Sequence, residues 1–179
     1  RVLEIGFGYG RELSCFCSLS NKVFGLELSG VTCHQALDGL KRRDIISLPG
    51  LVVYDGRMIP FSFEVFHLIY SCFVIQHLSK VWTANIIKES LRIMEPGGCI
   101  LFEFFGDLAY YGKNGQDMLS ESAEGDQMFN NAYLKEEIEK LIVNCGGYLK
   151  WLEPWHIRRG WDNWWACFSK NVEKGWNDS

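Results

Sequence analysis

Residues 2–10 read Val2-Leu3-Glu4-Ile5-Gly6-Phe7-Gly8-Tyr9-Gly10, an apolar run followed by three glycines at alternate positions. The apolar run predicts a buried strand over 2–5, and the pattern that follows predicts a helix over 11–19. Glycine suits a turn where the backbone bends tightly or approaches a ligand closely, and a helix N-terminus offers free N–H groups. The stretch therefore predicts a ligand-binding turn, although its glycine spacing differs from the G-x-G-x-x-G pattern of dinucleotide-binding turns.

Alternating strands and helices follow this turn along the rest of the chain. Strands are expected at 23–28, 51–54, 66–73 and 99–105, and helices at 30–43, 81–94 and 133–145. Pro96-Gly97-Gly98 separates the helix expected at 81–94 from the strand after it. Two more strands, 148–151 and 164–168, are joined by a loop around Pro154 that is too short for a parallel crossover, so they are expected to be antiparallel.

This alternation predicts an α/β fold. We expect a Rossmann-like, seven-stranded, mostly parallel sheet with helices on both faces and a C-terminal antiparallel strand pair. One domain should span 1–170, followed by a tail at 171–179. The sequence does not begin with Met and has no signal-peptide pattern, and we expect that N-terminal helices are missing from it.

The composition excludes several classes of protein. The 179 residues are 47% hydrophobic and 22% charged with a net charge of −4, which fits a folded domain and not a disordered chain. The acidic balance argues against a nucleic-acid partner, and no apolar run reaches the roughly 18 residues of a membrane span. Seven cysteines without a C-x-x-C pair indicate reduced, buried thiols in a cytoplasmic protein and no metal site.

Ligands of an open parallel sheet bind beyond the carboxyl ends of its strands, so residues that follow the strands are the site candidates. Glu27 ends the second strand, where an acidic residue accepts hydrogen bonds from the ribose hydroxyls of a nucleoside. A surface carboxylate is the alternative for Glu27. Asp55 ends the third strand and could accept from an exocyclic amine such as that of adenine, or Asp55-Gly56 could serve only as a turn.

Further candidates follow the fourth and fifth strands. His77 is the best candidate for a general base, although a packing or capping role at a helix start is the interpretation we favour. Glu103, Tyr110 and Tyr111 either line the site of a second substrate or belong to an ordinary loop with aromatic cover.

Six of the seven tryptophans lie between residue 151 and the C-terminus. Trp151, Trp164 and Trp165 belong to the last two predicted strands, where aromatic rings pack well in a core or at a sheet edge. Trp155 and Trp161 flank the connection between those strands and are candidates for exposure. Some of these rings could face a surface covered by absent helices or by the second subunit of a homodimer.

Six segments carry a family resemblance in sequence order: 2–10, 23–29, 54–61, 66–71, 76–78 and 94–98. In this order they resemble the class I S-adenosylmethionine-dependent methyltransferases. The branch that they resemble most is the small-molecule methyltransferases of the ubiquinone/menaquinone-biosynthesis type. One departure is Phe66-His67, where the family usually has Phe-Asp.

The resemblance implies S-adenosyl-L-methionine as the cofactor and assigns residues to its parts. The turn around its methionine would be formed by Glu4, Gly6, Gly8 and Gly10. Its adenosine would be bound by Glu27 at the ribose and by Leu28, Asp55 and Gly56 around the adenine. Its sulfonium would be bordered by Ser71, Cys72 and Phe73.

The expected function is methyl transfer to an unidentified small-molecule acceptor by in-line displacement. Positioning is the main contribution of the protein to such a reaction, since the methyl donor is already activated. A nicotinamide-dependent oxidoreductase is one alternative, which the glycine spacing disfavours. A non-catalytic methyltransferase-like binding module is another, which the intact glycines and acidic residues disfavour.

Overall fold

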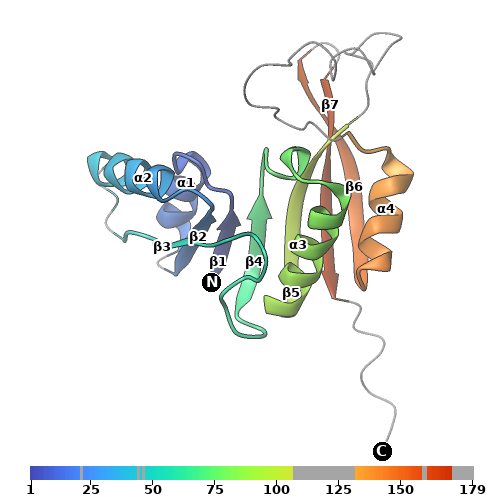
Figure 1. The fold of residues 1–179 in the computed structure, drawn as a ribbon, viewed down its shortest axis with the longest axis horizontal. Coiled ribbons are helices and arrows are strands. Elements are labelled where there is room, and N and C mark those ends of the chain that lie inside the picture. Colours follow the sequence, from blue (N-terminus) through green and yellow to red (C-terminus); the bar gives the residue numbers. More distant parts are fainter. Residues whose placement is uncertain (21, 44, 46, 107–131, 159–160, 171–179) are drawn as a thin grey trace, which may run out of the picture.

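A computed structural model describes residues 1–20, 22–43, 45, 47–106, 132–158 and 161–170 (Figure 1). Its strands are β1 (Val2–Ile5), β2 (Val23–Glu27), β3 (Gly50–Val53), β4 (Phe66–Ser71), β5 (Met94–Phe105), β6 (Gly147–Arg158) and β7 (Trp161–Lys170). Its helices are α1 (Arg11–Leu19), α2 (Gly30–Arg42), α3 (Lys80–Ile93) and α4 (Lys135–Asn144), with a 3-10 turn η1 (Ile75–His77).

The strands form one seven-stranded sheet in the order β3-β2-β1-β4-β5-β7-β6. The first five strands of this order are parallel, whereas β7 is antiparallel to both β5 and β6. The predicted α/β fold and its C-terminal antiparallel pair are therefore confirmed. The chain runs outward from β1 to β3 and then returns to β4 on the other side of β1, which creates a topological switch point between β1 and β4.

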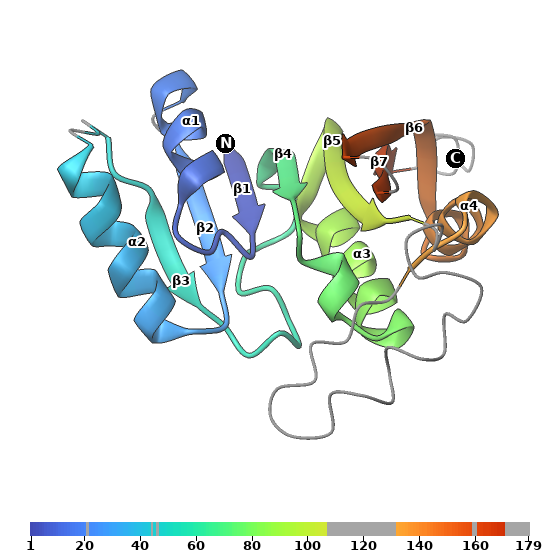
Figure 2. The ribbon, with the colours of Figure 1, turned by 90° about the horizontal axis from the view of Figure 1, so that it is seen from above.

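Helices cover both faces of the sheet, as predicted, and each face has its own core. One core joins α1 and α2 to the sheet through Leu13, Ala36, Leu40 and Val23. The larger core joins α3 and α4 to the opposite face, and its fully buried members include Phe66, Phe102, Phe104, Ile87 and Ile142. Figure 2 shows α1 and α3 on opposite sides of the central strands.

Local signals in the sequence account for the helix starts that border the switch point. Ser29 caps α2 by accepting a hydrogen bond from the backbone N–H of Thr32 at 3.2 Å. Ser79 caps α3 in the same way, at 3.4 Å from the N–H of Trp82. Gly10 precedes α1 in the left-handed conformation, with a φ of 75°.

Two predicted boundaries are wrong at prolines. Pro96-Gly97-Gly98 lies inside β5 and not between helix and strand, because the chain becomes extended at Met94, which pairs with Phe66. A shift in register between Phe66 and Leu68 accommodates the extra residues, since a proline has no N–H for the ladder. Pro154 likewise lies inside β6 and not in a loop, which is tolerated because β6 is the outermost strand.

The aromatic residues of the last two strands lie partly in the sheet core and partly on its surface. Trp165 is half-buried and stacks on Tyr70 of β4, with ring centroids 5.5 Å apart. Trp164 packs against the larger core, whereas Trp151 and Trp155 in β6 are exposed. Trp155 therefore belongs to a strand and not to a loop, although its predicted exposure is confirmed.

Within the part of the chain that the structure describes, no helix has both the length and the apolar character needed to cross a membrane. The predicted tail, 171–179, lies outside the described residues.

Candidate functional site

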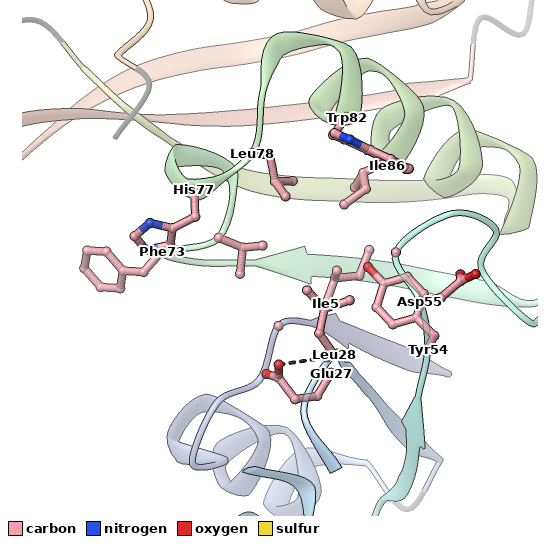
Figure 3. A pocket seen from close by; sticks show the side chains of 13 residues that line it. Ile5, Glu27, Leu28, Tyr54, Asp55, Phe73, His77, Leu78, Trp82 and Ile86 are labelled. Carbon is pink, nitrogen blue, oxygen red and sulfur yellow. Dashed lines mark hydrogen bonds between the residues drawn. The ribbon is translucent and has the colours of Figure 1, made fainter. Parts of the chain in front are cut away.

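A cavity of about 450 Å³ lies at the carboxyl ends of β1, β2 and β3 and beyond β4, at the topological switch point (Figure 3). Open α/β sheets bind their ligands at this place because several strands end there together. The cavity is lined by Ile5, Gly6, Glu27, Leu28, Tyr54, Asp55, Gly56, Phe73, Val74, His77, Leu78, Trp82 and Ile86. The structure thus brings together seven predicted site residues: Gly6, Glu27, Leu28, Asp55, Gly56, Phe73 and His77.

The glycine turn after β1 has a backbone that other residues rarely adopt. Gly6, Gly8 and Gly10 have φ values of 72°, 52° and 75°. A Cβ atom at Gly6 would also come within 2.2 Å of Val74 Cγ2, whereas a Cβ at Gly8 would meet nothing within 4 Å. Gly6 is therefore needed for close approach to Val74, and Gly8 leaves open space beside the turn.

The carboxylate of Glu27 connects the glycine turn to the end of β2. Its Oε2 accepts a hydrogen bond from the N–H of Gly8 at 3.1 Å, and its Oε1 accepts from the N–H of Leu28 at 2.8 Å. These bonds hold the side chain on the cavity wall, where Figure 3 shows it beside Leu28. A carboxylate oxygen has a second lone pair, so Glu27 can still accept from a ligand hydroxyl.

Residues 54–56 form another part of the wall. Asp55 Oδ1 accepts from the N–H of Arg57 at 3.0 Å, and Gly56 has a φ of 80°, so the turn expected of Asp-Gly is present. The same residues also line the cavity, which makes the turn and the ligand-binding interpretations of Asp55 compatible. Tyr54 packs beside them, and burial raises the pKa of its phenol to about 12.

Glu4 lies beneath the glycine turn and not on the cavity wall. Its side chain is 2% exposed, and its Oε2 has no hydrogen-bond partner among the described residues. Burial, with a smaller contribution from the nearby Glu12, raises the pKa of this carboxyl from 4.5 to about 8, and Arg11 partly opposes the change. Buried polar atoms are normally paired, so an orphan carboxylate oxygen at a glycine turn is a place for a ligand donor.

The three residues expected to border a sulfonium differ in what their side chains do. Ser71 is fully buried and donates to the carbonyl of Ile5 at 3.1 Å, which ties β4 to β1. Cys72 donates its thiol hydrogen to Oε2 of Glu103 at 3.0 Å, and burial, together with that carboxylate, raises the thiol pKa. Phe73 lines the cavity in a strained left-handed conformation, with a φ of 57°.

Glu103 is a buried anchor in this structure. Its side chain is 2% exposed and also accepts from the N–H of Phe73 at 2.8 Å and from Nδ2 of Asn163. These donors come from β7 and from the turn after β4, so Glu103 holds the strained turn in place. Tyr110 and Tyr111, the other residues predicted for a second substrate, lie outside the described residues.

His77 ends η1 and lines the cavity. Its Nε2 lies 3.2 Å from Nε2 of Gln76, and its N–H donates to the carbonyl of Val74 at 2.9 Å. The His77 side chain therefore lines the cavity, while its backbone N–H closes the turn with Val74. This arrangement is compatible with a general base and with a packing or capping residue, the two roles expected for His77.

Sequence reasoning missed the apolar wall of the cavity, formed by Ile5, Tyr54, Val74, Leu78, Trp82 and Ile86. Trp82 and Ile86 are four residues apart in α3 and so lie on one face of the helix, while Leu78 directly precedes its cap, Ser79. That spacing was a usable signal, but it is indistinguishable from an ordinary core stripe until the position of β4 is known. The described residues contain no group of three or more His, Cys, Asp or Glu that could hold a metal ion.

Comparisons with known proteins agree with this architecture. A family model described as "Methyltransferase domain" matches residues 3–102. A SAM-dependent methyltransferase from Methanosarcina mazei has a TM-score of 0.78 at 16% identity, over 96% of this chain and 92% of that one. No curated protein matches the sequence.

Two other solved structures mark the range of activities on this fold. The magnesium protoporphyrin IX methyltransferase from Synechocystis PCC 6803, solved with bound SAH, has a TM-score of 0.76 at 12% identity, over 95% of this chain and 74% of that one. The cyclase SpnF also has a TM-score of 0.76, at 15% identity, over 96% of this chain and 74% of that one. Likeness at these identities shows the fold, and the fold alone does not choose the reaction.

Proposed function

The chain belongs to the methyltransferase-domain family, and on that basis we propose that it transfers a methyl group from S-adenosylmethionine (SAM) to a small-molecule acceptor. The observation that carries the proposal is the cavity at the switch point, which combines the glycine turn with Glu27 and Asp55. The resemblance further suggests the ubiquinone/menaquinone-biosynthesis type and a cytoplasmic location.

The residues around the cavity fit the parts of SAM. Glu27 lines the wall, and its bonds from the N–H groups of Gly8, Leu28 and Ser29 keep the carboxylate oriented. Its Oε2 accepts only from Gly8 among these and keeps a lone pair for a ribose hydroxyl. Asp55 can accept from the adenine amine, while Leu28, Leu78 and Trp82 offer apolar surface to the flat base. These groups match the donors and the shape of an adenosine.

Glu4 offers a carboxylate to the amino group in the methionine part of SAM. A buried carboxylate with an unpaired oxygen is unfavourable alone, which is why burial raises its pKa to about 8. A nearby ammonium group would lower that pKa and compensate the burial. The amino group of a methionine portion has this charge, so Glu4 fits a role as its counter-ion.

The catalytic contribution that we propose for the chain is positioning. When bound, SAM supplies an activated methyl group on a positively charged sulfur. The turn at Cys72 and Phe73, held by Glu103, would align acceptor and donor, and alignment of this kind lowers barriers by up to roughly 7–11 kcal/mol. His77 would act as a general base only for an acceptor that is protonated at working pH.

Calorimetric titration with SAM and with its demethylated product, S-adenosylhomocysteine (SAH), tests the proposal. We expect micromolar binding of both, and an affinity at least about tenfold weaker in Glu27→Ala, which loses charge-assisted hydrogen bonds to the ribose. Glu136→Ala, the same substitution at an exposed position on α4, is the matched control and should bind like the wild type. Wild-type protein that binds neither compound would contradict the proposal.

A fluorescence titration with NADH separates this proposal from the oxidoreductase alternative. We expect no saturable change, since the glycine spacing does not suit a pyrophosphate. Incubation with methyl-labelled SAM and fractions of small metabolites then identifies the acceptor by transfer of the label. A protein that binds SAM but labels no metabolite fraction would favour the non-catalytic alternative.

A further inference from the structure

The cavity has two walls that face one another, and both depend on α3. Trp82 and Ile86 of α3 lie on one side, and Tyr54 and Asp55 lie on the other (Figure 3). The second wall belongs to residues 54–65, a connection between β3 and β4 that forms neither helix nor strand. Backbone hydrogen bonds fix only the ends of this connection, where the N–H of Tyr54 donates to the carbonyl of Glu27 at 3.1 Å and the N–H of Val65 donates to that of Ile93 at 2.7 Å. Other bonds must hold the residues between them.

Side chains of α3 provide those bonds. Asn85 donates to the carbonyl of Arg57 at 2.7 Å, only two residues after Asp55. Glu89 Oε2 accepts from the N–H of Ile59 at 2.9 Å. Arg92 donates to the carbonyls of Ile59 and Phe61, each at 2.8 Å.

Glu89 and Arg92 also hold one another in a fixed geometry. Arg92 Nε donates to Glu89 Oε1 at 2.9 Å, and Arg92 Nη2 donates to Glu89 Oε2 at 2.7 Å. Their side chains are only 18% and 20% exposed, so water screens the pair less than it screens a surface ion pair. The guanidinium lowers the pKa of Glu89, which keeps the carboxylate ionised.

Apolar packing completes the attachment. Ile59 is 2% exposed, and Phe61 packs edge-to-face on Phe66 of β4 with ring centroids 4.9 Å apart. Arg92 lies over the ring of Phe63 at 5.1 Å from its centroid. The connection is thus anchored along 57–63, immediately beyond the residues that form the cavity wall.

We propose that Asn85, Glu89 and Arg92, together called the clamp, are positioning residues. They set the width of the adenine slot, which is the part of the cavity between Trp82 and Tyr54, and the place of Asp55 in it. The same helix supplies one wall and holds the other, so these three side chains determine how the walls face each other. The inference rests on the proposed function, because it assigns the slot to the adenine of SAM.

Selectivity for the base distinguishes positioning from a merely structural role. The inosine analogue of SAH carries a carbonyl oxygen where adenine has its amine, so an Asp55 placed at that amine faces an acceptor instead of a donor. A correctly placed Asp55 should favour SAH by at least about tenfold, as one charge-assisted hydrogen bond requires. A variant in which Asp55 is displaced should lose that preference for SAH. A lower fraction of folded protein would instead reduce the measured affinity for both ligands by the same factor.

The experiment measures calorimetric affinities for SAH and S-inosylhomocysteine in wild type, Glu89→Gln, Arg92→Lys and Asn85→Ala. Lys88→Ala, an exposed residue on the same helix, is the control. We expect each clamp variant to bind SAH about tenfold more weakly and to prefer it by less than about threefold, with Lys88→Ala unchanged. Asn85→Ala removes only one exposed bond and keeps the test open should the other two variants fail to fold.

Two results would overturn the inference alone, and a third would overturn the proposed function as well. Folded variants that keep the wild-type preference for SAH would show that the clamp does not place Asp55. A loss of affinity that is equal for both ligands would assign the clamp to stability alone. A wild type that binds neither ligand refutes the proposed function itself, and the inference with it.

Discussion

Replacement of Glu4 by glutamine should stabilise the protein at neutral pH. Burial raises the pKa of this carboxyl from 4.5 to about 8, so the folded protein holds the proton more tightly than the unfolded chain does. The resulting stability is fully present below pH 4.5 and is lost as the pH rises to about 8. Glutamine resembles the protonated carboxyl and has no proton to lose, so Glu4→Gln should not show this loss.

The size of the effect follows from the two pKa values. Between these two pKa values, each rise of one pH unit lowers the free energy of unfolding of the wild type by about 1.4 kcal/mol, which amounts to about 3 kcal/mol between pH 5 and pH 7. A domain of this size has a total stability of roughly 5–15 kcal/mol, so the change is large. In thermal unfolding it corresponds to roughly 6–12 °C.

Urea unfolding of ligand-free protein at pH 5, 6, 7 and 8 measures this difference. Wild type and Glu4→Gln should be similarly stable at pH 5 and should diverge as the pH rises, with the variant more stable. Other titrating groups are common to both proteins and cancel in the comparison. Glu136→Gln, at an exposed position, should follow the wild type. Parallel curves for wild type and Glu4→Gln would refute the reasoning, because they would show that Glu4 is ionised in the folded state.

Three other outcomes are expected. SAM binding at pH 7 should release close to one proton from the wild type and none from Glu4→Gln, since an ammonium group near Glu4 lowers the pKa of its carboxyl. Calorimetry in buffers of different ionisation enthalpy measures the number of protons released. A binding enthalpy of the wild type that does not change with the buffer would argue against this prediction. Gly6→Ala should cost about 1–3 kcal/mol in urea unfolding and weaken SAH binding, because its Cβ would overlap Val74; unchanged stability and binding would contradict the tight turn. Glu103→Ala should lower the free energy of unfolding by about 1–3 kcal/mol for each donor left unpaired. Glu103→Gln keeps an acceptor, so its free energy of unfolding should fall by less. Equal decreases for the two variants in urea unfolding would show that the hydrogen bonds from Phe73 and Asn163 do not contribute to stability.

The main features of the fold follow from local patterns. Strand and helix periods, caps such as Ser29 and the left-handed glycines act over a few residues, so they can be recognised without a structure. The same holds for Glu27 and Asp55, because each ends a strand and strand ends meet at one edge of a parallel sheet. The strand boundaries expected at Pro96 and Pro154 were wrong, because a proline is tolerated in a strand at a bulge or at a sheet edge. Whether a strand has either feature depends on the strands beside it.

Glu103 shows where local reasoning stops. Its place near the carboxyl end of a strand suggested a residue that meets a substrate, yet its partners Cys72 and Asn163 lie 31 and 60 residues away in sequence. The role of the Glu89–Arg92 ion pair in the clamp could not be predicted either, because ion pairs three residues apart on a helix are common. Its role comes from the connection between β3 and β4 that it holds. In both cases the role of the side chain depends on which donors and acceptors from distant parts of the sequence lie beside it.

The sequence by itself determined the order of strands and helices, the glycine turn and the acidic residues at the strand ends, because backbone conformation and hydrophobic period are local properties. Tertiary structure decided which side chains form the cavity walls, that Glu4 is left with an unpaired oxygen, and that Glu103 serves the turn at Phe73. Burial and hydrogen-bond pairing depend on residues brought together across the sheet, and these determine what each carboxylate can do.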